Sequence, residues 1–97
     1  MSWSVTYARS ARKDLRKLPS NDRERIVERI GALTKGQANL DIKRVSARDK
    51  TERLRVGSYR VIFRYDFPKR EIEIERILRR NEATFRVLAW LALWGIA

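Results

Sequence analysis

The spacing of apolar side chains changes near the start of the chain, and the change predicts two kinds of element. Residues 3–8, WSVTYA, alternate apolar and polar side chains, as a half-buried β-strand does. One face of this strand would carry Trp3, Val5 and Tyr7. Beyond it, apolar residues recur every three or four positions until Pro19, which is typical of a helix that ends there. The chain is therefore predicted to begin with a strand followed by a helix.

A second and longer helical pattern follows. Its apolar stripe is expected to contain Ile26, Val27, Ile30 and Leu33. Ser20 or Asn21 can cap its N-terminus, and Glu24 stands three residues after Asn21, as in a capping box. Gly36 is expected to end the helix. This pattern predicts two consecutive helices.

The rest of the chain alternates with a period of two. The polar segment 36–51 is expected to be a linker that Ile42 and Val45 anchor to the core. Three strands are then predicted over residues 52–57, 59–65 and 71–78, separated by turns at Gly57-Ser58 and at Asp66 to Pro68. One face of these strands would carry Arg53, Arg55, Arg60 and Arg64. The predicted fold is α+β in the order β-α-α-β-β-β, with both helices on one face of a small, mainly antiparallel sheet.

Charge points to the class of partner. The 97 residues, enough for one domain, contain 23 Lys and Arg against 12 Asp and Glu, a formal net charge of +11. A polyanion is the expected partner, nucleic acid before an acidic membrane surface or protein. Without Cys and His the usual nitrogen and sulfur zinc ligands are missing, so neither a metal nor another cofactor is expected. The N-terminus lacks the apolar core of a signal peptide, which predicts a cytoplasmic protein without a membrane partner.

Several segments in order carry a family resemblance. ARSARKDLRKLP, RERIVERI, LDIKRV, RLRVGSYRVIF and ERILRRNEATFR resemble the RelE/ParE superfamily of bacterial and archaeal toxins, in particular its RelE-like branch. The resemblance covers residues 3–86 and suggests a toxin domain over residues 1–86. It implies a toxin that enters the ribosomal A site, cleaves the mRNA there, and is held inactive by a cognate antitoxin. Residues 87–97, VLAWLALWGIA, form an apolar extension of unknown role that is too short to span a bilayer.

The resemblance also implies which residues act. Arg55 and Arg60 match catalytic positions of the family, and Arg80, or alternatively its neighbour Arg79, matches the C-terminal arginine that closes around the same phosphate. The residues expected to bind RNA are Arg53, Lys43, Arg44, Arg79 and Phe85, although Lys43 and Arg44 could equally belong to a solvated loop. Cleavage without a metal uses the neighbouring 2′-OH as nucleophile, and it needs a base, an acid and cations that stabilise the phosphorane. Arginine forks suit the last task.

Two residues depart from the family's pattern. Arg55 is a poor general base because a guanidinium group keeps its proton, and Phe85 lacks the hydroxyl of the Tyr that relatives often have there. Glu52 or Glu82 would be the remaining carboxylate base. The alternatives are a ParE-like, non-catalytic inhibitor of DNA gyrase and an inactive relative that binds only RNA or an antitoxin. The basic residues of the first helix are expected to form a general electrostatic surface: Arg12, Lys13, Arg16 and Lys17.

Overall fold

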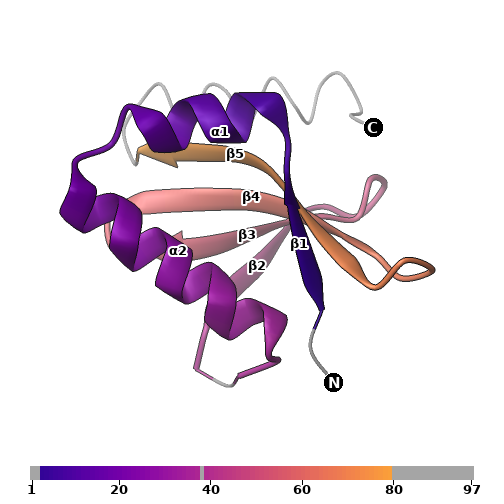
Figure 1. Cartoon of the computed structure of the whole chain (residues 1–97). Helices are drawn as coiled ribbons and strands as arrows, with labels where there is room; N and C mark the ends of the chain where they lie inside the picture. Colours follow the sequence, from indigo (N-terminus) through magenta and orange to yellow (C-terminus); the bar gives the residue numbers. More distant parts are fainter. Residues whose placement is uncertain (1–2, 38, 80–97) are drawn as a thin grey trace.

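In the described part of the chain, a five-stranded sheet is covered on one face by two helices (Figure 1). The structure, a computed structural model, describes residues 3–37 and 39–79. Its elements are β1 (Ser4–Tyr7), α1 (Arg9–Arg16), α2 (Ser20–Thr34), β2 (Asp41–Ser46), β3 (Thr51–Val56), β4 (Tyr59–Asp66) and β5 (Glu71–Arg79). The sheet order is β1-β5-β4-β3-β2, in which β1 runs parallel to β5 and all other neighbours are antiparallel. This confirms the predicted α+β class, with one additional strand.

That additional strand is β2, which lies in the segment predicted to be a linker. It pairs with β3 at one edge of the sheet, where Ile42 lies opposite Leu54 and packs against the core. Most of its other side chains are polar because an edge strand is solvated on more than one side. Because β2 carries polar residues on both faces, its sequence does not show the alternation of apolar and polar side chains that marks a strand. A register shift between Arg44 and Ser46 marks a bulge near its end.

The start of α2 also differs from the prediction. The helix begins at Ser20 with Pro19 in the capping position, and no side chain caps it, so the capping box of Asn21 and Glu24 is wrong. The carbonyl oxygen of Pro19 instead accepts the first bond, from the backbone N–H of Arg23. The helix already includes Ser20 and Asn21, so neither side chain lies at the capping position, which Pro19 occupies.

The apolar stripe of α2 is narrower than predicted. Ile26, Ile30 and Leu33 are buried, whereas Val27 is 46% exposed. Each residue turns about 100° around a helix axis, so Val27 lies outside the face that Ile26 and Ile30 define. The predicted end at Gly36 agrees with the structure, where Gly36 has a φ of +66° just after the helix.

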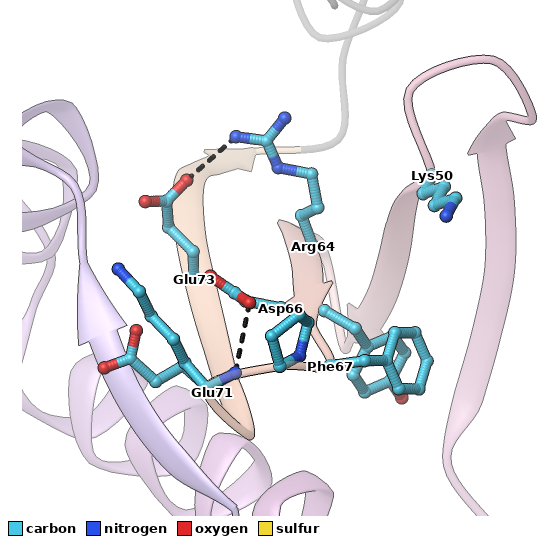
Figure 2. A pocket seen from close by; sticks show the side chains of 9 residues that line it. Lys50, Arg64, Asp66, Phe67, Glu71 and Glu73 are labelled. Atoms are coloured by element: carbon cyan, nitrogen blue, oxygen red, sulfur yellow. Dashed lines mark hydrogen bonds and ion pairs between the residues drawn. The ribbon is translucent and has the colours of Figure 1, made fainter.

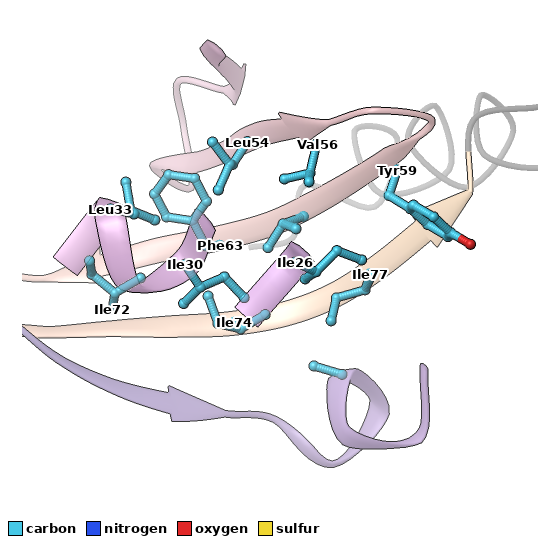
Figure 3. Close-up of a cluster of buried hydrophobic side chains, with 12 residues drawn as sticks. Ile26, Ile30, Leu33, Leu54, Val56, Tyr59, Phe63, Ile72, Ile74 and Ile77 are labelled. Carbon is cyan, nitrogen blue, oxygen red and sulfur yellow. The ribbon is translucent and has the colours of Figure 1, made fainter. Parts of the chain in front are cut away.

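Both helices and the inner face of the sheet share one hydrophobic core (Figure 3). Among its fully buried residues are Val61, Phe63, Ile72 and Ile74, as the alternation in β4 and β5 predicted. Each such side chain contributes about 1.5–3 kcal/mol when it leaves water. Within the described residues, neither helix is long and apolar enough to cross a membrane.

A bulge in β5 fixes α1 on the sheet. Glu75 is an extra residue in the pairing of β5 with β4, which leaves the local backbone without its regular partner. Asp14 of α1 fills this place, because its Oδ2 accepts hydrogen bonds from the Ile77 N–H and from Arg76 Nε, both at 2.9 Å. The carboxylate thereby ties the helix to the centre of the fold.

Candidate nucleic-acid interface

The β3–β4 hairpin forms the centre of the face that points away from the helices, here called the outer face. Its two-residue turn places Gly57 at a φ of +58°, which a residue with a side chain adopts only under strain. A Cβ at Gly57 would also lie 3.2 Å from Nη1 of Arg25, which reaches the turn from α2. The hairpin is thus held in a single register.

That register gathers four of the predicted site residues on the outer face. They are Lys43, Arg53, Arg55 and Arg60, which alternate with side chains of the opposite face. Lys43 is the cross-strand partner of Arg53, and Arg55 is that of Arg60. Like charges directly opposite each other destabilise a sheet, so this arrangement costs free energy unless an anion binds between them. The pattern points to an anion-binding face.

Arg60 is more enclosed than its place on the polar side of the hairpin suggested. Its residue is only 7% exposed, and Nη1 donates to the carbonyl oxygen of Tyr59 at 3.5 Å. Next to it on the same face, Ile62 is fully buried. Replacement of Arg60 is therefore a change in a buried place and not at the surface.

Two predicted RNA contacts lie on the other side of the sheet. Arg44 faces Glu52, its cross-strand partner, with Nε 3.9 Å from Oε1. Arg79 lies over the ring of Tyr59, 5.9 Å from its centroid, on the side of the sheet where Tyr59 belongs to the core. Glu52 is thus separated by the sheet from the outer-face arginines, which leaves it poorly placed as their base. Arg80, Glu82, Phe85 and the extension 87–97 lie outside the described residues.

An acidic residue that the sequence did not single out joins the basic residues. Asp41, on β2, places Oδ1 3.6 Å from Nη2 of Arg53 and Oδ2 4.0 Å from Nη1 of Arg55. The Nε of Arg53 is buried without a hydrogen-bond partner. Asp41 therefore pairs with one guanidinium nitrogen of each arginine, whereas the buried Nε of Arg53 is left without an acceptor. Only the pairing of β2 with β3 could have revealed Asp41, and β2 was predicted to be a linker.

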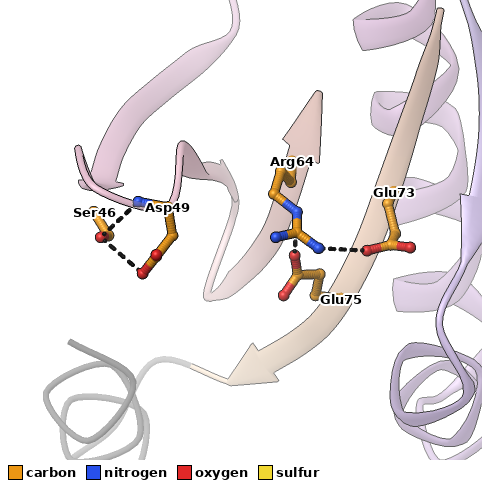
Figure 4. Close-up of polar contacts among 5 residues, drawn as sticks. All are labelled: Ser46, Asp49, Arg64, Glu73 and Glu75. Atoms are coloured by element: carbon orange, nitrogen blue, oxygen red, sulfur yellow. Dashed lines mark hydrogen bonds and ion pairs between the residues drawn. The ribbon is translucent and has the colours of Figure 1, made fainter. Parts of the chain in front are cut away.

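The far end of the outer face has a different character (Figure 4). Arg64 contacts Glu73 and Glu75, each with an N–O distance of 3.2 Å. Burial raises the pKa of Glu75 above its ordinary value, the Arg64 charge opposes this, and the nearby Glu73 and Asp49 carboxylates add to it. Arg64 is committed to two carboxylates, so this group of side chains does not attract phosphate.

A hollow of about 350 Å³ lies beside the β4–β5 hairpin at this mixed end (Figure 2). Its charged lining residues are Lys50, Arg64, Lys69, Asp66, Glu71 and Glu73, three of each sign. Phe67 at its rim is 62% exposed and contacts the rings of Trp3 and Tyr65, with centroid distances of 5.4 and 5.6 Å. Balanced charge makes the hollow a poor phosphate site. The described residues contain no cluster of three or more acidic side chains that could hold a metal ion.

A hydrogen bond of Tyr59 joins the end of the β3–β4 hairpin to helix α2. Its hydroxyl donates to Oδ2 of Asp22 on α2 at 2.8 Å, and this bond together with burial raises the pKa of Tyr59 above its ordinary value. Tyr59 thereby fastens the strand that carries Arg60 to α2. The arginines of the outer face are supported by a rigid frame.

Comparison with known proteins identifies relatives of the whole arrangement. The family model described as the ParE toxin of the type II toxin–antitoxin system parDE matches residues 5–84. A comparison with curated proteins gives no match.

Solved structures of toxins share the fold. The toxin–antitoxin complex RelBE2 from Mycobacterium tuberculosis contains a chain 28% identical, with a TM-score of 0.69 over 82% of this chain and 100% of that one. The RelB–RelE complex from Methanococcus jannaschii has a chain 27% identical, with a TM-score of 0.70 over 86% and 98%. A mutant of the E. coli toxin RelE in the free state is 19% identical, with a TM-score of 0.74 over 100% of both chains, a likeness of fold alone.

Proposed function

The chain belongs to the ParE toxin family of type II toxin–antitoxin systems, and from this membership we propose that it is a ribosome-dependent endoribonuclease. In this proposal the toxin cleaves mRNA in the ribosomal A site and thereby inhibits translation. Two RelE-containing complexes that are 27% and 28% identical to the chain support the RelE-like activity over other members of the superfamily.

One observation carries the proposal, namely the placement of Arg55 directly opposite Arg60 on the outer face. Two guanidinium groups on neighbouring rigid strands can each offer a planar pair of donors to the oxygens of one phosphate. A base removes the proton of the 2′-OH, whose oxygen forms a bond to phosphorus. The bond from phosphorus to the 5′-oxygen breaks, an acid protonates that oxygen, and negative charge builds on the phosphorane in between. Fixed donors aimed at such charge commonly contribute a factor of about 10²–10³ each.

Asp41 and Arg53 complete the proposed phosphate site. The Asp41 carboxylate holds the forks of Arg53 and Arg55 before RNA arrives, as a phosphate would hold them later. Asp41 is about half exposed, with 53% of its side chain accessible, so an incoming phosphate can displace it. The buried, unpartnered Nε of Arg53 is a donor for that phosphate. We assign these arginines the electrostatic role and not the proton transfers.

The proposed partner in the resting state is a cognate antitoxin. The relatives from M. tuberculosis and M. jannaschii are toxins in complexes with antitoxins, which supports such a partner for this chain. An acidic, amphipathic antitoxin segment would complement the basic end of the outer face. Ribosomes and mRNA as targets place the proposed activity in the cytoplasm.

The test maps mRNA 5′ ends in cells after induction of the toxin. We expect new ends at codon-spaced positions in translated messages. Arg55→Gln should lose about 10²-fold or more of this cleavage, because it removes one phosphate contact and leaves the inner face packed. Lys69→Gln, which removes the same charge from the exposed β4–β5 turn, should cleave like the wild type. Equal cleavage by Arg55→Gln and the wild type would overturn the proposed mechanism.

A second candidate is inhibition of DNA gyrase without catalysis. The match to a family model described as ParE favours it, since the superfamily resemblance assigns gyrase inhibition to that branch. Supercoiling by purified gyrase in the presence of the toxin decides the question. Loss of supercoiling without new mRNA ends would favour this candidate. Undiminished supercoiling together with no new mRNA ends would favour an inactive relative that only binds RNA or an antitoxin.

A further inference from the structure

A second basic surface lies on helix α1, which is not part of the outer face of the sheet. We call it the α1 row, and it consists of Arg9, Arg12, Lys13, Arg16 and Lys17. These positions follow the spacing of three and four residues that places side chains on one side of a helix. All five residues are exposed, whereas Ala11 on the opposite side of the helix is fully buried.

The α1 row has no internal counter-charge. Within the described part of the chain, none of its five cations forms an ion pair, in contrast to the arginines of the outer face. The helix does contain one carboxylate, that of Asp14. It turns inward to Arg76 and the Ile77 N–H and is therefore not available to the row. The positive potential of the row is directed to the solvent.

Helix stability does not account for these cations. The helix dipole favours Lys13 and Arg16 in the last turn, but it disfavours Arg9 in the first turn, where no acidic residue stands. Cations four residues apart, such as Arg12 and Arg16, repel each other by about 0.2–0.5 kcal/mol per pair. A row that weakens its own helix suits an anionic ligand.

We propose that the α1 row binds the phosphate backbone of double-helical RNA. The row extends roughly 12 Å along the helix axis at about 1.5 Å per residue, and it offers five cations to a polyanion. It contains no aromatic side chain on which an unpaired base could stack, and no exposed apolar side chain that could anchor a protein segment. Backbone contact is the mode of binding that remains.

The position of α1 separates this site from the proposed phosphate site. Helix α1 covers the inner face of the sheet (Figure 1). Ala11 turns to the core and the exposed row lies on the opposite side of the helix, whereas Arg55 and Arg60 lie on the outer face. The protein can therefore contact one RNA segment with the α1 row while the outer face contacts another. This proposal does not depend on cleavage, because it concerns affinity for RNA alone.

The test measures binding of the full-length protein to a short, blunt-ended, fluorescent RNA duplex at 50 and 200 mM salt. The triple variant Arg12→Gln, Lys13→Gln, Arg16→Gln removes three contacts of the row. Gln has nearly the same helix propensity as Lys and Arg, so α1 should persist. A matched control carries Arg29→Gln, Lys35→Gln and Lys69→Gln, which remove three exposed charges from other elements.

Salt dependence distinguishes a site from net charge. Each phosphate contact contributes roughly 0.7–0.9 to the slope of log K against log salt, so wild-type affinity should fall roughly 20- to 40-fold more than that of the triple variant over this range. The control should retain the wild-type slope. Equal slopes for the triple variant and the control would overturn the proposal. So would a triple variant that binds the duplex normally but loses binding to polyglutamate, because the row would then serve an acidic protein.

Folding is checked by thermal melting of each variant. Should the triple variant unfold, the double variant Arg9→Gln, Lys17→Gln removes the two ends of the row and should lower the slope by roughly 1.4–1.8. An unchanged slope in a folded double variant would equally contradict the proposal. Normal mRNA cleavage by either variant leaves the proposal intact, since cleavage tests the outer face.

Discussion

The two basic surfaces of the protein differ in how their charges are compensated. On the outer face Arg53 and Arg55 share the Asp41 carboxylate, whereas no cation of the α1 row has an ionic partner among the described residues. A paired arginine loses long-range attraction but gains a fixed geometry. An unpaired lysine or arginine on a helix keeps its field, yet its long side chain stays mobile. The outer face thus suits a contact with a developing charge, and the α1 row suits binding.

The largest expected effect breaks the geometry of the outer face and keeps its charge. Arg60→Lys retains a cation but replaces a planar fork with a single ammonium, and we expect cleavage in a translating extract to fall about 10²-fold. Arg64→Lys, the same change four residues along β4, should cleave within a few-fold of the wild type because Arg64 is committed to Glu73 and Glu75. Cleavage by Arg60→Lys at the wild-type level would mean that charge and not geometry matters at this position.

Arg60→Ala is less informative than its place in the sequence suggests. Because the residue is 7% exposed, truncation should also destabilise the protein, by roughly 0.5–3 kcal/mol. Melting of purified Arg60→Ala measures this loss. A melting temperature equal to that of the wild type would show that the buried guanidinium contributes nothing to folding.

The strands that cross the core could be predicted from the sequence, but the edge strand could not. In β4 the apolar residues Val61 and Phe63 are two positions apart and both point to the core, because one face of a central strand is buried. In β2 only Ile42 reports a core face, which is too little to reveal a period of two. Asp41 was missed for the same reason, since its role depends on pairing with β3.

A bulge in β5 decides on which side of the sheet Arg79 lies. The alternation of apolar and polar residues in the sequence does not reveal this bulge. Ile72 and Ile74 point to the core, but the extra residue Glu75 reverses the pattern, so that Ile77 and not Arg76 continues it. Arg79 follows Ile77 by two positions and therefore shares the side of Tyr59. A polar residue between apolar ones is consistent with either pattern until its partner strand is known.

A smaller effect is expected from removal of the internal counter-charge. Asp41→Asn should bind single-stranded RNA roughly 1.4- to 5-fold more tightly at low salt, because an exposed ion pair is worth about 0.2–1 kcal/mol and the RNA no longer competes with it. Fluorescence titration measures the gain. Glu24→Gln on the exposed side of α2 makes the same change of net charge and serves as the control. An equal gain from Glu24→Gln would reduce the role of Asp41 to its contribution to net charge.

The smallest expected effect concerns the mixed end of the outer face. Burial raises the pKa of Glu75 in the folded protein and outweighs the opposing charge of Arg64. A carboxyl whose folded pKa is raised stabilises the fold at low pH, and this contribution is lost as the pH rises through the folded pKa. Glu75→Gln does not titrate, so its melting temperature relative to the wild type should increase between about pH 4 and pH 7. Arg64 keeps Glu73 as a partner at 3.2 Å in the variant.

Thermal melts of both proteins across this pH range measure the difference, with Glu24→Gln as a carboxamide replacement on an exposed helix face. A relative melting temperature that falls with rising pH would show that the Arg64 ion pair dominates over burial. The charge of Arg64 would then be neutralised by carboxylates as fully as the charges of Arg53 and Arg55 are. The whole outer face would then differ from the α1 row, whose cations have no ionic partner among the described residues. If the relative melting temperature rises instead, burial dominates over the ion pair at Arg64. Stabilising ion pairs on the outer face are then limited to the end where the proposed phosphate site lies.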